Sequence, residues 1–164
     1  MVLELKELTL GSKQEESFQY ELVRENLGDL GAPILVGPAR VRGKAQKQPD
    51  CILLQCTVEF TLQYACDRCA AVATRPFCYS FEHALLPESD PQVDDGYFRI
   101  PGDTLDLDEL IRADCLLELP SKLLCRDDCK GLCPQCGTNW NEHSCTCSQN
   151  QVDPRLEVLK QFID

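Results

Sequence analysis

Apolar residues, many of them β-branched or aromatic, are concentrated in three segments of the first half of the chain. These segments, 34–43, 51–64 and 70–86, have the composition of β-strands. The polar stretch at 44–50 predicts a hairpin turn between the first two, and Pro76 predicts a bend or bulge in the third. Three consecutive strands with short connections indicate an antiparallel meander.

Weaker patterns flank these strands. Leu3 and Leu5 alternate with charged residues, which predicts a short strand. The stretch 18–22 fits a short strand or a helix. Residues 87–103 are rich in Pro, Gly and Asp, so we expect a solvated connector with a short strand at 97–100.

The spacing of apolar residues changes to a helical period at 105–120, which predicts an amphipathic helix. Asp106 is its expected N-cap, Glu109 stands at the capping-box position, and Pro120 lies beyond its end. One face of this helix carries Leu107, Leu110, Ile111 and Cys115. A last helix is expected at 153–162, with Asp153 as N-cap and Pro154 in the first helical position.

Composition places the chain among globular proteins. It has 164 residues and 43% hydrophobic residues, and no apolar run reaches the length of a membrane span. The first residues lack the features of a secretory signal or a transit peptide, so we expect a cytoplasmic protein without a membrane partner. In a reducing compartment, twelve cysteines favour metal binding over disulfides.

The spacing of the cysteines separates two groups. Four are isolated within predicted strands or the helix, and we interpret them as small buried hydrophobes: Cys51, Cys56, Cys78 and Cys115. The other eight form four close pairs: Cys66 and Cys69, Cys125 and Cys129, Cys133 and Cys136, Cys145 and Cys147. Eight thiolates in close pairs provide the ligands for two tetrahedral zinc ions per chain.

The pairs can be combined in two ways. We favour one site formed by the pairs 66/69 and 125/129, and a second formed by 133/136 and 145/147. The alternative joins 125/129 to 133/136 and leaves two pairs for a looser site. Spacing alone leaves iron open as well, as in a rubredoxin-like electron carrier. His143 and His83 are interpreted as solvated residues rather than ligands.

The "CPQCG" segment has the form of a zinc knuckle. Pro134 fixes the turn, and Gly137 permits an unusual φ that lets backbone N–H groups approach the second sulfur. The Cys66-x-x-Cys69 segment stands between two predicted strands rather than at a strand–helix junction. This context favours a metal knuckle over a thioredoxin-type redox pair.

Charge is distributed unevenly along the chain, whose formal net charge is −11. Residues 88–109 include eight acidic residues and one basic residue, whereas residues 34–85 include six basic and four acidic residues. If RNA is bound directly, the candidate contacts are Arg40, Arg42 and Lys44 on one strand face, and Arg68, Arg75, Lys122, Arg126 and Lys130 around the first site. The alternatives are that these are solvated charges, or that the acidic connector binds a basic protein.

Catalytic patterns are missing from the sequence. It has two histidines and no nucleophile elbow, phosphate-binding loop or dinucleotide motif, so we expect neither an enzyme nor a small-molecule substrate. The acids of 88–109 are interpreted as a solvated face. A zinc ion held by four thiolates has no open coordination position, so the metal is expected to be structural.

Taken together, "CDRC", "LDLDELIRADCLLELP", "CKGLCPQCG" and "DPRLEVLK" resemble the YceD family, the large ribosomal RNA subunit accumulation proteins. The resemblance implies a non-catalytic factor for 23S rRNA accumulation and ribosome assembly, in the bacterial cytoplasm or in a plastid stroma. It implies as partner the large-subunit rRNA, its precursor or a basic ribosomal protein. Some members lack the 133–147 cysteines, in agreement with the favoured pairing. Trp140 stands where Leu is more usual, and is not expected to touch the ligands.

The patterns together predict an α+β fold with two parts. Residues 1–103 form a β-rich domain, an antiparallel meander that ends in the acidic connector. Residues 104–164 form the helix, a small cysteine-rich zinc module and the C-terminal helix.

Overall fold

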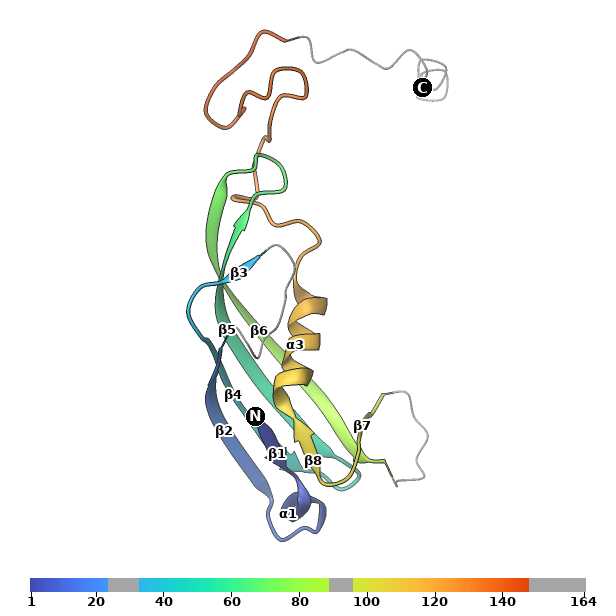
Figure 1. Cartoon of the computed structure of the whole chain (residues 1–164). Helices are drawn as coiled ribbons and strands as arrows, with labels where there is room; N and C mark the ends of the chain where they lie inside the picture. The colour runs from blue at the N-terminus through green and yellow to red at the C-terminus, as the bar shows by residue number, and fades with distance from the viewer. Residues whose placement is uncertain (24–32, 89–95, 148–164) are drawn as a thin grey trace, which may run out of the picture.

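The computed structural model describes residues 1–23, 33–88 and 96–147, which form an elongated α+β structure (Figure 1). Its elements are β1 (Val2–Glu4), α1 (Lys6–Thr9), β2 (Glu15–Leu22), β3 (Ile34–Leu35), β4 (Ala39–Lys47), β5 (Ile52–Ala65), β6 (Val72–Pro87), β7 (Phe98–Ile100), β8 (Thr104–Asp106) and α3 (Leu107–Glu118). The helix predicted at 153–162 lies outside the described residues.

In the described residues, a six-stranded sheet forms the body of the protein. Strands β2, β4, β5 and β6 are antiparallel neighbours in that order, so the predicted meander is confirmed, although the first predicted strand, 34–43, is divided between β3 and β4. Strand β3 pairs with the end of β5, and β7 pairs in parallel with the end of β6. The weak pattern at 18–22 belongs to strand β2, and the short strand expected near 97–100 is β7. A separate two-stranded ribbon joins β1 to β8.

Two local expectations for these strands are corrected. The turn expected at 44–50 is shorter, because β4 continues to Lys47 and the Gln48 N–H closes the turn on the Cys51 carbonyl (2.8 Å). The bulge expected at Pro76 is absent, because β5 and β6 pair without a break through Thr61 and Pro76. Among the described residues, β7 pairs only with Leu85, Leu86 and Pro87 of β6. At Pro76 the side of β6 away from β5 is therefore a free sheet edge, where a proline is tolerated.

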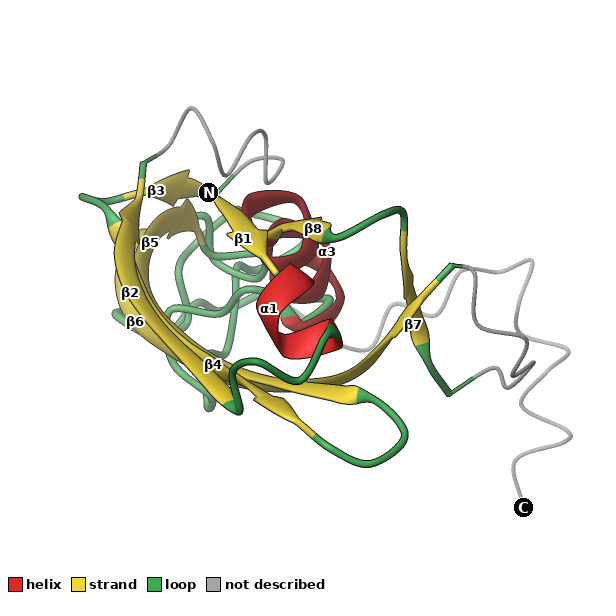
Figure 2. Cartoon of the chain, turned by 90° about the horizontal axis from the view of Figure 1, so that it is seen from below, coloured by secondary structure: helices red, strands yellow, loops and turns green. Residues whose placement is uncertain are grey.

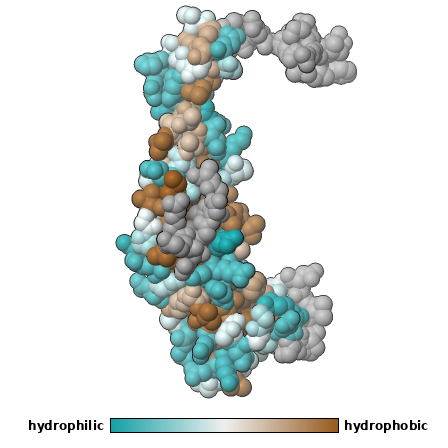
Figure 3. All heavy atoms as spheres, viewed as in Figure 1, coloured by the Kyte–Doolittle hydropathy of each residue, from teal (hydrophilic) through white to brown (hydrophobic). Residues whose placement is uncertain are grey.

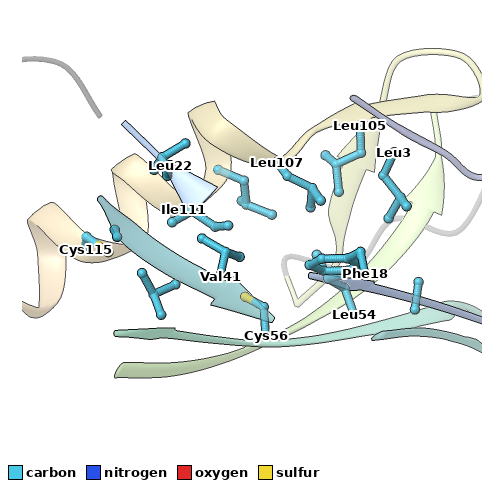
Figure 4. Close-up of a cluster of buried hydrophobic side chains, with 14 of the residues drawn as sticks. Leu3, Phe18, Leu22, Val41, Leu54, Cys56, Leu105, Leu107, Ile111 and Cys115 are labelled. Carbon is cyan, nitrogen blue, oxygen red and sulfur yellow. The ribbon is translucent and has the colours of Figure 1, made fainter. Parts of the chain in front are cut away.

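The hydrophobic core lies between the sheet and helices α1 and α3, which occupy the concave side of the curved sheet (Figure 2). Every second residue of β5, from Ile52 to Tyr64, is buried on this side, as the two-residue period of a strand requires. In this cluster Val41 of the sheet faces Ile111 of α3, and Leu54 lies beside Phe18 (Figure 4). A Cβ at Gly43 would lie 2.6 Å from the Phe18 ring, so this position needs glycine.

Helix α3 begins as the sequence predicts. The Asp106 carboxylate accepts hydrogen bonds from the N–H groups of Asp108 and Glu109 (3.0 and 3.5 Å) and caps the helix. The four apolar residues predicted for one face are all buried in the same core as the strands. The domain boundary at 103/104 stays a prediction, and the residues on its two sides share this core. No helix in the described ranges is both long and apolar enough to cross a bilayer.

His83 and the isolated cysteines differ in part from expectation. His83, interpreted as solvated, is 23% exposed and its Nε2 lies 2.8 Å from Asp114 Oδ2 of α3, because β6 runs beside the helix. Cys56 and Cys115 are buried in the core as predicted, whereas Cys51, just before β5, is only partly buried. Cys78 is exposed, because odd-numbered residues of β6 face the core and Cys78 lies on the opposite side. Burial raises the pKa of Cys56 to about 11 and that of Cys115 to about 12, so both thiols stay neutral.

Candidate metal centres

The tip of the β5–β6 hairpin carries the first pair of cysteines. The Cys66 N–H donates to the Ala71 carbonyl (2.9 Å), and the Ala70 N–H donates back to the Cys66 carbonyl (2.8 Å). Ala70 has a φ of 56°, a conformation that costs a residue with a Cβ. This compact turn places Cys66 and Cys69 on the same side of the hairpin tip.

The segment that follows α3 brings the second pair to this tip. The Tyr64 hydroxyl donates to the Leu124 carbonyl (3.0 Å). The Asp67 N–H donates to the Leu123 carbonyl (2.9 Å), and its carboxylate accepts from the Leu123 N–H (2.6 Å). These bonds connect parts of the chain 56 to 60 residues apart, and they place Cys125 and Cys129 beside the first pair.

The four sulfurs at the hairpin tip, which we name the first cluster, belong to Cys66, Cys69, Cys125 and Cys129. They all lie within 4.8 Å of one another, with 3.8 Å between the sulfurs of Cys66 and Cys129 and 3.6 Å between those of Cys69 and Cys125. A tetrahedral zinc ion about 2.3 Å from each sulfur requires sulfurs about 3.8 Å apart. The first cluster therefore has the spacing of a metal site.

Burial and hydrogen bonding set the protonation of these thiols. Burial raises the pKa of Cys66, but the N–H groups of Cys125, Arg68 and Cys69 stabilise its thiolate, and its pKa falls to about 6. Burial and the neighbouring thiols raise the pKa of Cys125 to about 12. Without a cation, repulsion between neighbouring charges keeps some of the thiols protonated, whereas a bound dication would deprotonate all four.

The second cluster consists of the sulfurs of Cys133, Cys136, Cys145 and Cys147, which also lie within 4.8 Å of one another. Its knuckle resembles the first: the Gly137 N–H donates to the Cys133 carbonyl (2.9 Å), and Gly137 has a φ of 72°. All its ligands come from a single short stretch at the end of the molecule away from the sheet (Figure 1). It is more exposed than the first cluster, with only Cys133 buried.

Hydrogen bonds also stabilise thiolates in the second cluster. The hydroxyl and N–H of Thr138 lower the pKa of Cys136 to about 6, with 3.0 Å between Thr138 Oγ1 and the sulfur. The neighbouring Cys136 and then burial raise the pKa of Cys147 to about 12. As in the first cluster, four neighbouring thiolates require a cation to offset their repulsion.

The structure brings together the two groups of four cysteines favoured from the sequence, rather than the alternative combination. All twelve cysteines are described and have free thiols, so none is in a disulfide. Both clusters could hold a metal ion. The His143 ring is exposed and contributes no atom to either cluster.

Sequence reasoning missed the side chains that hydrogen-bond to the sulfurs. Trp140, expected to stay away from the ligands, donates its indole N–H to the Cys145 sulfur (3.3 Å). Asn141 donates its amide N–H to the Cys129 sulfur (3.3 Å). Their position in the sequence could have indicated this role, because both have N–H donors and lie between two cysteine pairs. Thiolates in metal sites commonly accept hydrogen bonds from such side chains.

The eight candidate RNA-binding residues are dispersed. The alternation of β4 places Arg40, Arg42 and Lys44 on the sheet face opposite the core. Three of the cations form ion pairs: Arg42 with Glu59 (2.7 Å), Arg75 with Asp127 (3.4 Å) and Arg126 with Asp128 (3.4 Å). The Arg68 guanidinium donates to the Cys129 carbonyl (2.8 Å), so this side chain supports the first cluster. Among the described residues, the side chains of Arg40, Lys44, Lys122 and Lys130 form no ion pair or hydrogen bond.

Comparison with known proteins gives one family and several relatives. Residues 54–163 match the family model described as large ribosomal RNA subunit accumulation protein YceD. The chain is 28% identical over 154 residues to the uncharacterized protein YlbN of Bacillus subtilis, covering 92% of this chain and 90% of the relative. It is 38% identical over 65 residues to the uncharacterized protein Rv2926c of Mycobacterium tuberculosis, covering 40% of this chain and 31% of the relative. No solved structure matches the chain.

The family match extends over most of the chain and includes both clusters. It begins within β5, covers the hairpin tip and α3, and continues past Cys147. The B. subtilis relative aligns over nearly its whole length, so the likeness is not limited to the cysteine pairs. The chain belongs to the YceD family of large ribosomal RNA subunit accumulation proteins.

Proposed function

We propose that this protein is a non-catalytic factor with two structural zinc ions, and that it supports the accumulation of 23S rRNA during assembly of the large ribosomal subunit. The family description supports the role in rRNA accumulation. The observation that carries the zinc proposal is the spacing of the first cluster, whose 3.6 and 3.8 Å sulfur separations match the edges of a tetrahedral site.

The ligand sets support a structural role for the metal. Each cluster consists of four cysteine sulfurs, with no histidine or carboxylate in either set. Four thiolates complete the coordination of zinc and leave no position for water or substrate. In the first cluster, the metal would hold the segment after α3 against the hairpin tip. In the second, it would hold a short loop of the chain closed.

The partner in this proposal is large-subunit rRNA, its precursor or a basic ribosomal protein, in the bacterial cytoplasm or a plastid stroma. Three candidate RNA contacts are neutralised by carboxylates, which weakens the case for a continuous phosphate-binding surface. On the face seen in Figure 3, hydrophilic residues are distributed along the molecule rather than gathered in one patch. With eight thiolates and two zinc ions, the formal charge would fall from −11 to about −15, which favours a basic protein partner.

Metal content and absorbance of the purified protein test the zinc proposal. We expect two zinc ions per chain by elemental analysis and no visible absorbance. A red, iron-containing protein with a measurable reduction potential would instead indicate a rubredoxin-like electron carrier. Fewer than two metal ions per chain would contradict the two-site proposal.

Binding to precursor large-subunit particles tests the proposed role. We expect the zinc-loaded protein to sediment with these particles, and the protein stripped of zinc by a chelator to lose this association. Charged contacts to RNA and to a basic protein both weaken with salt, so binding to protein-free precursor rRNA is what distinguishes the two partners. No association in low salt would contradict the proposal.

A further inference from the structure

The loop between the two halves of the second cluster carries two adjacent residues that contact sulfurs of different clusters. Trp140 donates its indole N–H to Cys145 of the second cluster (3.3 Å). Asn141, the next residue, donates its amide N–H to Cys129 of the first cluster (3.3 Å). A single turn of chain therefore connects the two groups of ligands.

The orientation of the Asn141 amide follows from its other bonds. Its Oδ1 accepts from the Lys130 N–H (2.8 Å) and from the Arg126 guanidinium (2.7 Å), both in the segment that carries ligands of the first cluster. Its Nδ2 also donates to Asn139 Oδ1 (2.8 Å). Because two donors point at the oxygen, the nitrogen must face the Cys129 sulfur.

The position of Asn141 depends in turn on the second cluster. Loop 137–144 is attached at both ends to ligands of that cluster, Cys136 and Cys145. Two backbone bonds join the loop to the segment before it: the Cys133 N–H donates to the Thr138 carbonyl (2.8 Å), and the Trp140 N–H donates to the Gly131 carbonyl (3.0 Å). A metal ion in the second cluster would hold the two ends of the loop together and so fix the path of residue 141.

We propose that Asn141 couples the two metal sites, so that a metal ion in the second cluster increases the affinity of the first cluster for its own ion. The inference rests on the proposed function, because it requires that both clusters bind metal. The coupling operates through one hydrogen bond to the Cys129 thiolate and one to the Lys130 N–H. By linkage, the first ion must raise the affinity of the second cluster by the same factor.

The size of the effect follows from the behaviour of residues that support metal ligands. Loss of such a hydrogen-bonding partner lowers metal affinity about 10- to 100-fold. We therefore expect Asn141→Ala to weaken the first site by about that factor when the second site is filled. When the second site is empty, the loop is no longer held, and the same substitution should change the affinity of the first site less than about threefold.

The test is chelator competition on the full chain, followed by ¹¹³Cd NMR, in which each four-sulfur site gives its own resonance. The resonance that Cys136→Ser removes identifies the second site. The affinity of the first site is then measured in the wild type, Asn141→Ala, Cys136→Ser and the double variant. Ser144→Ala is the matched control, since Ser144 lies exposed in the same loop and its side chain makes no hydrogen bond to a described residue.

A second substitution separates the hydrogen bond to sulfur from a general disruption of the loop. Asn141→Asp keeps the oxygen that accepts from Lys130 but removes the donor to Cys129. It should weaken the first site at least as much as Asn141→Ala and shift the ¹¹³Cd resonance of that site, while the second resonance stays in place. Ser144→Ala should leave both resonances and both affinities unchanged.

The coupling is overturned if Asn141→Ala has the same effect with the second site filled or empty, because Asn141 would then support Cys129 independently of the second metal. It is also overturned if Asn141→Ala weakens only the second site. In either case the wild type still binds two metal ions and the proposed function stands. If the wild type binds fewer than two ions, the proposed function fails, and the coupling fails with it.

Discussion

The two clusters have the same ligands but depend differently on the rest of the fold. The first joins a hairpin tip to a segment 56 residues away, and three of its four cysteines are buried. The second draws its ligands from 133–147, and only Cys133 is buried. The comparison teaches that a cysteine set formed by distant segments acts as a tertiary contact, whereas a local set organises only its own loop.

Removing one ligand from each cluster should give the largest difference. Cys66→Ser and Cys136→Ser are each expected to reduce the zinc content from two ions to one. Because the first ion holds the hairpin tip to the segment after α3, Cys66→Ser should lower the free energy of unfolding by about 4 kcal/mol with zinc a thousandfold above its Kd. Cys136→Ser should lower it by only about 1 to 3 kcal/mol, because the loop it releases is not part of the hydrophobic core and the loss acts through the about 10- to 100-fold weaker first site.

Urea unfolding followed by far-UV circular dichroism, together with elemental analysis, checks this difference. Cys78→Ser is the control, since Cys78 is exposed and belongs to neither cluster. Equal destabilisation by the two cluster variants would show that the second cluster is as integral to the fold as the first. Loss of both ions from Cys66→Ser would contradict the grouping of the ligands.

Thiol reactivity of the metal-free protein should also distinguish the clusters. Cys66 and Cys136 both have a pKa of about 6, so both are mainly thiolates at pH 7. Cys66 is only 3% exposed, whereas Cys136 is exposed. Since reactivity requires both a thiolate and access, iodoacetamide should modify Cys136 about ten times faster or more.

Mass spectrometry of quenched samples measures both rates. A pKa lowered to about 6 means that the thiolate is lost as the pH falls through 6, so the Cys136 rate should fall about tenfold between pH 7 and pH 5. Zinc loading should protect both residues. Equal modification rates for Cys66 and Cys136 at pH 7 would show that the hairpin tip opens without its metal. The two clusters would then not differ in burial in the metal-free protein.

Regular elements could be predicted because their signals are local. The β-branched and aromatic residues of β5 and the capped, one-sided helix α3 are visible in consecutive residues, and both elements are confirmed. The unbroken pairing through Pro76 and the exposure of Cys78 could not be predicted in this way. Both depend on the register of β6 against β5, which is set by the whole sheet.

The candidate ligands were predictable for a similar reason. Close cysteine pairs are rare in a sequence and have a narrow chemical meaning, so eight positions could be assigned from spacing alone. The side chains around the sulfurs could not be assigned, because the bonds of Trp140 and Asn141 depend on the path of a loop without regular structure. The His83–Asp114 pair was missed because it joins a strand to a helix 31 residues away.

The glycines of the two clusters provide the smallest and most local comparison. Gly131 and Gly137 have φ values of 80° and 72°, so alanine is strained at either position, by about 1 kcal/mol. At Gly131 a Cβ would also lie 3.1 Å from the Arg68 carbonyl oxygen, whereas at Gly137 nothing lies within 4 Å. Gly131→Ala should therefore lower the free energy of unfolding by about 2 kcal/mol, and Gly137→Ala by about 1 kcal/mol.

Urea unfolding and the zinc affinity of each site check this prediction. Ala70, which has a φ of 56° in the first knuckle, shows that such a turn accepts alanine, so both variants should fold. The additional loss in Gly131→Ala should appear at the first site, because Gly131 packs against Arg68 of the hairpin tip. Equal losses of unfolding free energy in the two variants would mean that the contact between Gly131 and Arg68 is loose. The segment that carries Cys125 and Cys129 could then shift as readily as the loop of the second cluster.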